Sequence, residues 1–117
     1  MEYIEGLVAA VPNKNKSEYI EHAKRTASIF KSHGALRLVE CWGDDVPPGE
    51  ITSFPKAVKC QSDETVVLAW IVWPSKEIRD AGMEAIMSDE KMNSEMTQMP
   101  FDGSRLIYGG FQIVVDE

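Results

Sequence analysis

Residues 39–49, VECWGDDVPPG, bring together side chains that often do chemistry, because a thiol, three carboxylates and an indole lie within eleven residues. A metal site here would draw its ligands from Glu40, Cys41, Asp44, Asp45 and His33. Successive side chains of a strand point to opposite faces, so Glu40 and Cys41 would be separated, and no H-x-E-x-H type spacing is present. We therefore expect no metal ion and no other cofactor.

Cys41 could instead act as a nucleophile, but it would need a neighbouring base to form a thiolate, and the chain has only two histidines. A lone cysteine in a strand is more often a small buried hydrophobic residue. A structural interpretation competes, in which Trp42 anchors the strand end and Gly43 turns the chain. Asp44 and Asp45 then hydrogen-bond the backbone of the turn. The functional alternative places this stretch at the rim of a binding cavity.

The two histidines, His22 and His33, fall near one flank of a predicted helix, with Thr26 and Ile29 between them. They could form a pair at the edge of a pocket. Alternatively, His33 interacts favourably with the negative end of the helix and His22 is partly exposed. Both interpretations stay open.

Further residues could complete a cavity. Its candidate walls are Trp42, Trp70, Trp73 and Tyr108, and its candidate polar groups are His22, His33, Asp44 and Arg105. Arg105 and Tyr108 could recognise an anion or a phenol at the cavity mouth. A salt bridge at the start of a strand and an aromatic contact between sheets would explain these two residues equally well.

The elements that position these residues can be placed from the sequence pattern. Residues 3–12 predict a strand that Pro12 closes, and Asn15 with Glu18 predicts a capped helix over about 16–33, ended by Gly34. Its predicted buried face is Tyr19, Ile20, Ala23, Ala27 and Phe30. Residues 35–43 predict the second strand.

A long connection, residues 44–63, follows, with a turn at Pro47-Pro48-Gly49 and a second break at Phe54-Pro55. Connections of this length are often functional, so this one could be a lid or a dimer arm. Residues 65–73 predict the third strand, and a second helix starts at Pro74-Ser75. Its predicted buried face is Ile78, Ala81, Gly82, Ala85 and Ile86, and Gly82 predicts a close approach of that helix to the sheet. A short helical turn within 89–99 and a fourth strand, 105–115, complete the chain.

This β-α-β, loop, β-α-β order predicts an α+β, ferredoxin-like fold over a single domain, 1–117: one antiparallel sheet with two helices on one face. Residues 66–73 are eight consecutive apolar residues, without the alternation of a half-solvated strand. Both faces of the sheet must therefore be covered. The simplest cover for the second face is the same sheet of another subunit, which predicts a homodimer that closes as an α/β barrel.

Glycines and methionines predict where a cavity would lie. Gly6 and Gly109-Gly110 fall on strands that this fold makes neighbours, so side chains would be missing from one region of the sheet. The flexible side chains that could fill or line an adaptable space between sheet and helices are Met83, Met87, Met92, Met96 and Met99.

Composition restricts the partners. The net charge of −7 opposes binding to phosphate backbones, so a nucleic acid is not expected as the main partner. The N-terminal residues are acidic where a signal peptide needs basic ones, and no segment predicts a membrane span. Cys41 and Cys60 lack C-x-x-C spacing, so we expect reduced thiols and a cytoplasmic location.

Four stretches spanning most of the chain resemble the YbaA-like family of small bacterial proteins, a domain family of unknown function in the dimeric α/β-barrel superfamily. They are GLVAAVPNKNKSEYIEHA, HGALRLVECWGDDVPPGEIT, DETVVLAWIVWPSKEIRDAG and MPFDGSRLIYGGFQ. The resemblance implies the fold and a homodimer, and it defines no catalytic residue. The superfamily includes cofactor-free oxygenases, isomerases and dehalogenating or decarboxylating enzymes.

Three functional hypotheses follow. The first is a protein that binds, or an enzyme that transforms, a small hydrophobic or aromatic metabolite in a cavity of each subunit. The second is a non-catalytic homodimeric scaffold that presents its acidic surface or residues 44–63 to a protein partner. The third is an RNA-associated protein. Saturable stabilisation by one metabolite class would favour the first over the second.

Overall fold

A computed structural model describes residues 1–117. Four strands form one antiparallel sheet in the order β2-β3-β1-β4. Their bounds are Tyr3–Pro12 for β1, Arg37–Trp42 for β2, Glu64–Trp73 for β3 and Ile107–Gln112 for β4. The two long strands, β1 and β3, pair in the centre, with Tyr3 opposite Trp73 and Pro12 opposite Glu64.

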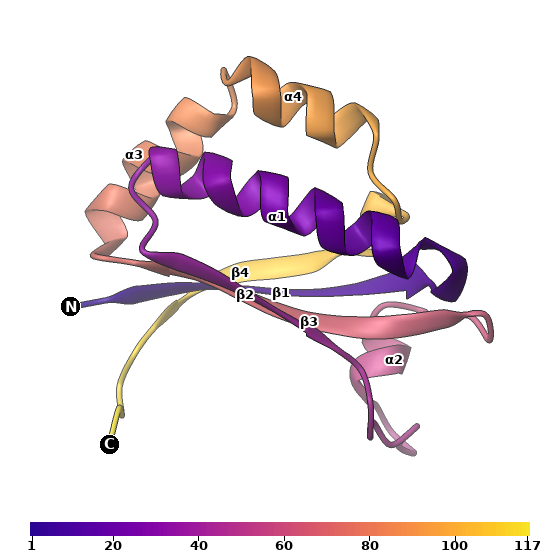
Figure 1. Cartoon of the computed structure of the whole chain (residues 1–117). Coiled ribbons are helices and arrows are strands. Elements are labelled where there is room, and N and C mark those ends of the chain that lie inside the picture. The colour runs from indigo at the N-terminus through magenta and orange to yellow at the C-terminus, as the bar shows by residue number, and fades with distance from the viewer.

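Three helices cover one face of this sheet, and a fourth lies on the other side (Figure 1). The covering helices are α1 (Lys16–Ser32), α3 (Lys76–Ile86) and α4 (Glu90–Thr97), and the fourth is the single-turn α2 (Phe54–Ala57). Short 3₁₀ helices, η1 (Asn13–Asn15) and η2 (Gly103–Arg105), precede α1 and β4. With α1 and α3 as crossovers and β1 and β3 in the centre, the predicted ferredoxin-like fold is confirmed.

The helix starts differ from the prediction at two places. Asn15 precedes α1, but its side chain does not cap that helix, because its amide nitrogen donates to the Pro100 carbonyl at 2.9 Å. Phe54-Pro55 does not break the chain but begins α2, since proline is tolerated in a first helical turn and Ser53 accepts a hydrogen bond from the Lys56 amide.

The buried face of α1 is rotated from the predicted one. Its buried residues are Tyr19, His22, Ala23, Thr26 and Ile29, whereas Ile20 is 41% exposed. His22 is therefore not partly exposed, as one interpretation held. Hydrophobicity alone misses this face because two of its members are polar residues whose hydrogen bonds are made inside the protein.

The buried face of α3 also differs from the prediction. Gly82 and Ile86 are buried, as expected, but Ile78, Ala81 and Ala85 are exposed. Arg79 turns inward instead, and its Nε lies 3.1 Å from a carboxylate oxygen of the buried Glu5 on β1. This ion pair lets a charged residue occupy the inner face of the helix.

Close packing fills one half of the space between helices and sheet. Trp73 is fully buried and its cluster includes Ile71, Ile29, Ile86 and Met92. A Cβ at Gly82 would lie 2.6 Å from the Trp73 ring and 2.7 Å from the His33 carbonyl oxygen, so only glycine fits there. The predicted close approach of this helix to the sheet is confirmed.

The opposite face of the sheet remains largely apolar and open. Leu68, Ile107 and Phe111 are 40%, 44% and 59% exposed, and they alternate with residues that face the helices. Near one end, Val58 follows α2 and packs against Ala10 and Val66. None of the helices is long and hydrophobic enough to span a lipid bilayer.

Candidate functional site

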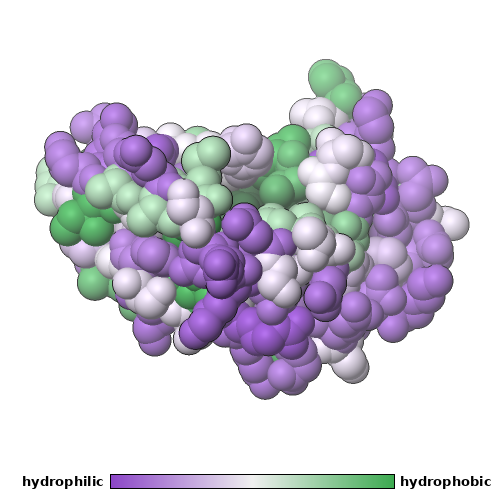
Figure 2. Space-filling model, turned by 90° about the horizontal axis from the view of Figure 1, so that it is seen from above, coloured by the Kyte–Doolittle hydropathy of each residue, from purple (hydrophilic) through white to green (hydrophobic).

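A cavity of about 120 Å³ lies in the other half of the space between helices and sheet. Its sheet side is formed by Leu7, Ala9, Leu38, Glu40, Val67, Ala69 and Ile71. Its helix side is formed by Tyr19, His22, Thr26 and Phe30 of α1, and Met96, Met99, Phe101 and Leu106 close it. Seen from the helix side, hydrophobic residues are recessed in a hollow between hydrophilic ones (Figure 2).

Small side chains on the two central strands leave this space open. Ala9 and Ala69 are both 4% exposed and both line the cavity. The glycines predicted to open the sheet lie elsewhere: Gly6 pairs with Gly109, and a Cβ at Gly6 would meet the Phe111 ring on the open face. The cavity between sheet and helices is therefore present, but alanines rather than glycines make its floor.

A tyrosine and a carboxylate form one polar wall of the cavity. The Tyr19 hydroxyl on α1 donates a hydrogen bond to Oε1 of Glu40 on β2. Glu40 faces Ala69 across the strand pair, on the side of the sheet that the helices cover. Burial raises the pKa of Glu40, and the hydrogen bond from Tyr19 opposes that rise. Burial and the neighbouring Glu40 carboxylate raise the pKa of Tyr19.

A histidine held by a carboxylate forms a second polar wall. Nδ1 of His22 lies 2.9 Å from Oε1 of Glu95 on α4, and Nε of Arg25 lies 2.7 Å from the other oxygen of that carboxylate. The hydrogen bond from Arg25, with a further one from His22, lowers the pKa of Glu95. An ionised carboxylate can only accept hydrogen bonds. Nδ1 of His22 therefore carries a proton and donates a hydrogen bond to Glu95. The Phe101 ring packs against both His22 and Tyr19.

The second histidine holds the other end of α4. Nε2 of His33 lies 2.7 Å from Asp89, whose carboxylate also caps α4 by accepting from the amides of Lys91 and Met92. The hydrogen bond from His33 is the main cause of the lowered pKa of Asp89. His22 and His33 therefore do not form one pocket-edge pair, because each ties α1 to a different end of the helix that covers the cavity.

The three tryptophans lie in three different surroundings. Trp42 flanks the cavity region, with its ring 6.3 Å from the Tyr19 ring and the Lys16 ammonium 5.1 Å above it. Trp73 is buried in the filled half of the layer. Trp70 lies opposite Gly6 on the open face of the sheet. The structure thus does not bring the three predicted walls together.

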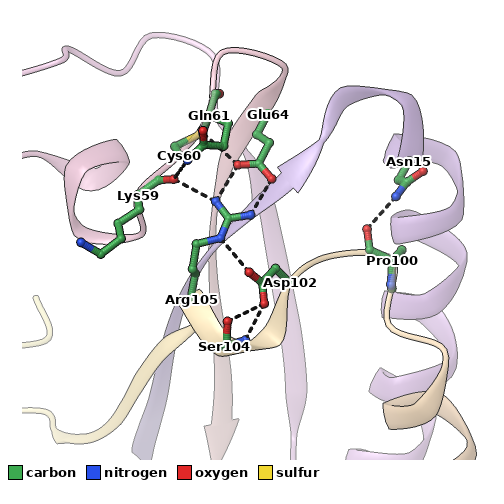
Figure 3. A network of polar contacts seen from close by, with 9 residues as sticks. All are labelled: Asn15, Lys59, Cys60, Gln61, Glu64, Pro100, Asp102, Ser104 and Arg105. Carbon is green, nitrogen blue, oxygen red and sulfur yellow. Dashed lines mark hydrogen bonds and ion pairs between the residues drawn. The ribbon is translucent and has the colours of Figure 1, made fainter.

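The other predicted residues lie outside the cavity. Asp44 is exposed in the connection after β2, and Tyr108 is 72% exposed on the edge strand β4. Arg105 forms a bidentate ion pair with Glu64, with both N–O distances 2.7 Å (Figure 3). Its guanidinium also contacts Asp102 at 3.0 Å and the Lys59 carbonyl at 2.8 Å. Arg105 therefore links the segment just before β4 to Lys59, which follows α2, and to Glu64 at the start of β3.

Sequence reasoning missed four polar residues of the site: Tyr19 as a cavity residue, Thr26, Glu95 and the inward orientation of Glu40. A signal existed for Glu40, since it lies between apolar residues of a predicted strand whose register sends Cys41 to the opposite face. No group of three or more His, Cys, Asp or Glu side chains is arranged to hold a metal ion.

A second buried polar cluster lies on the same sheet face outside the cavity. Glu5 pairs with Arg79, whose Nη2 donates to the Tyr3 hydroxyl at 3.3 Å. A Cβ at Gly110 would lie 1.8 Å from Arg79 Nη2, so glycine on β4 makes room for this guanidinium. Burial raises the pKa of Glu5, and the Arg79 charge opposes the rise. We assign this cluster a structural role in fixing α3 to β1.

The fold places the chain in a known structural class. A crystal structure of a variant of SnoaB, a cofactor-independent oxygenase from Streptomyces nogalater, superposes with a TM-score of 0.63 over 98% of this chain and 95% of that chain, at 14% sequence identity. At that identity the similarity defines an α+β fold with one antiparallel sheet, and no activity.

Sequence comparison gives the family. Residues 2–103 match the model described as "Protein of unknown function (DUF1428)". The uncharacterized protein YbaA of Escherichia coli is 51% identical over 117 residues, covering both chains completely, and the Shigella flexneri protein of the same name matches equally. This chain belongs to the DUF1428 family, and the predicted resemblance to YbaA-like proteins is confirmed.

Proposed function

We propose that this protein binds a small hydrophobic or aromatic molecule in the cavity between sheet and helices. The observation that carries the proposal is an apolar space of about 120 Å³ whose wall includes two polar groups, the buried His22 and the half-buried Glu40. Binding sites are typically apolar pockets with a few convergent polar groups. A purely structural core would fill such a space, because empty volume forfeits packing contacts.

The cavity volume limits the size of the ligand. An engineered apolar cavity of ~150 Å³ is large enough to bind benzene, so a space slightly smaller admits about one ring or a short chain. The structural similarity to SnoaB supports the proposal only by analogy, because it shows that a protein with this fold can act on a small molecule. Oxygenase activity is not part of the proposal.

The proposal is tested by titrating ¹⁵N-labelled protein with toluene and following backbone amide shifts. Saturable shifts confined to cavity-lining residues such as Leu7, Thr26 and Ala69 are expected. The Ala69→Val variant, which places two more methyl groups in the cavity, should lose this response. Absence of saturable shifts in the wild type would overturn the proposal and favour a scaffold that binds a protein partner.

We also propose that the molecule is a homodimer, in which the open face of the sheet packs against the same face of a second copy. Support comes from Leu68, Ile107 and Phe111, large apolar residues exposed on that face. Because a two-fold contact brings each patch against itself, apolar residues meet apolar residues. The two free cysteines, Cys41 and Cys60, are compatible with the reducing cytoplasm as its location.

Light scattering after gel filtration tests the assembly. The wild type should elute as a dimer, and Leu68→Glu, which buries a carboxylate in the proposed contact, should elute as a folded monomer. Glu84→Gln on the exposed side of α3 provides a control on a different surface and should remain dimeric. A monomeric wild type at micromolar concentration would contradict the dimer and leave the cavity proposal untouched.

A further inference from the structure

The hydrogen-bond donors around the cavity are already engaged within the protein. Nδ1–H of His22 donates to Glu95, the Tyr19 hydroxyl donates to Glu40, and the Thr26 hydroxyl donates to the Ala23 carbonyl at 3.1 Å. With His22 in its neutral form, each of these side chains has one polar hydrogen, and that hydrogen is already donated. A ligand therefore finds no free side-chain donor on these residues.

Acceptors, in contrast, remain unpaired. His22 is 6% exposed and lines the cavity, and no protein group hydrogen-bonds its Nε2. The two ring nitrogens point away from one another, so Nε2 is directed away from Glu95 while Nδ1 is fixed on it. In the neutral tautomer that carries its proton on Nδ1, His22 has a lone pair at Nε2. The second oxygen of Glu40 also has no protein partner.

A ligand that brings a hydrogen-bond donor into the cavity can pair with an acceptor that has no protein partner. The same walls discriminate against anions, because two carboxylates, Glu40 and Glu95, lie at or behind the cavity surface. A ligand carrying only acceptors, such as an ether or a ketone, would leave Nε2 unpaired. The walls therefore favour a neutral molecule with a hydrogen-bond donor, such as a hydroxyl group.

We propose that the cavity selects a neutral, single-ring compound with a hydroxyl group of the phenol type, and that His22 Nε2 accepts the hydrogen bond from that hydroxyl. The Glu95 carboxylate, held by Arg25, positions the imidazole and fixes its tautomer. This inference rests on the proposed small-molecule function and specifies its ligand class. It describes binding and includes no covalent step.

Three probes of similar size separate the inference from the function on which it rests. Phenol offers a donor, anisole only an acceptor and toluene neither. Titrations of the ¹⁵N-labelled protein should give dissociation constants for phenol about tenfold lower than for anisole, as expected for one buried hydrogen bond made rather than lost. The ¹⁵Nε2 resonance of His22 should shift with phenol and stay in place with toluene.

A His22→Phe variant tests the assigned acceptor, since it retains a ring of similar shape and leaves Glu95 paired with Arg25. Its phenol preference over anisole should disappear while toluene still binds. Equal affinities for the three probes in the wild type would overturn the inference and leave the proposed function standing. A phenol preference that survives in His22→Phe would overturn the role of His22, and failure of all three probes would overturn the inference together with the proposed function.

Discussion

The space between helices and sheet is filled in one half and hollow in the other, although the same strands and the same helix α1 contribute to both. Around Trp73, packing is so close that glycine is required at position 82. Around His22, alanines line the sheet, polar side chains face inward and about 120 Å³ remain. Protein interiors are usually close-packed, so the contrast between the two halves supports the proposed binding site in the hollow one.

Two carboxylates, Glu64 and Glu40, also differ in their partners and in their pKa values. Glu64 is paired with the charged Arg105 in a bidentate contact, and the hydrogen bonds from Arg105 lower its pKa. Glu40 is paired only with the neutral Tyr19, and burial raises its pKa. An ionised Glu64 favours folding, whereas an ionised Glu40 opposes it. Perturbed titration in a cavity is typical of functional residues, and satisfied ion pairs are typical of structural ones.

The largest expected effect comes from opening the filled half. Trp73→Ala should lower the free energy of unfolding by about 3–5 kcal/mol, because the cluster loses a fully buried indole and gains a cavity. Urea denaturation followed by circular dichroism measures the change. Tyr108→Ala, at an exposed aromatic residue, should change stability by less than about 0.5 kcal/mol. Similar losses in both variants would mean that Trp73 is not the centre of the packed half.

A second, smaller effect compares one substitution in two places. Ala10→Val adds two methyl groups to the filled cluster of Ala10, Val58 and Val66, and should cost about 1–3 kcal/mol of stability through overpacking. Ala69→Val adds the same groups to the hollow half and should leave the free energy of unfolding nearly unchanged. Both residues lie in central strands, so the β-propensity of valine cancels in the comparison. Equal costs would show that the space beside Ala69 is not available.

The sequence predicts the filled half better than the hollow one, for a physical reason. Runs rich in apolar residues located every strand, and the glycine within α3 predicted the close contact with the sheet that Trp73 makes. Periodicity could not locate the hollow half, because its inner face includes His22 and Thr26, which a hydrophobic pattern assigns to the surface. Their burial depends on partners such as Glu95, seventy-three positions away in the chain, and a single sequence does not pair such residues.

The residues predicted to line the cavity show the same limit of single-sequence prediction. Trp70 and Trp73 were grouped by their aromatic character, yet an odd separation along a strand sends their side chains to opposite faces. The sequence is compatible with either ligand recognition or a salt bridge at Arg105, and in the structure Arg105 forms a salt bridge with Glu64. Whether Trp42, Asp44 or Tyr108 contacts a ligand stays a prediction.

The pH dependence of stability gives a third test, in which the same change is made at two carboxylates. The raised pKa of Glu40 favours folding below its ordinary value of 4.5, and that contribution is lost as pH rises through the folded-state pKa. At neutral pH, Glu40→Gln should therefore be as stable as the wild type or up to about 1 kcal/mol more stable, with no gain in acid.

Glu64 should behave in the opposite sense. Its pKa is lowered, so its contribution is present above the ordinary value of 4.5 and is lost as pH falls through the folded-state pKa. Glu64→Gln should cost about 1 kcal/mol at neutral pH, because the charge of the pair is lost while the amide oxygen can still accept from Arg105, and nothing in acid. Urea midpoints measured between pH 3 and pH 7, roughly spanning both titrations, provide the comparison. If both substitutions changed stability in the same direction at neutral pH, the opposite pKa shifts assigned to Glu40 and Glu64 would be contradicted.

The smallest expected effect is local and concerns the helix that covers the hollow half. Met92 is the only buried residue of α4, and the helix is otherwise held to α1 by the His33–Asp89 and His22–Glu95 contacts. Both carboxylates have lowered pKa values, so this attachment is present above their ordinary values, 3.8 for Asp89 and 4.5 for Glu95, and weakens as pH falls through the folded-state values.

Hydrogen exchange measures this weakening directly, because local opening exposes amides without global unfolding. After correction for intrinsic rates, the amides of α4 should lose protection between pH 5 and pH 3, roughly the range in which these carboxyl groups titrate, while those of β1 and β3 keep theirs. In Glu95→Gln the end of α4 near His22 should be less protected already at neutral pH. Because α4 covers the cavity, exchange that stays uniform across α4 and the central strands would mean that the cover opens only when the whole fold does.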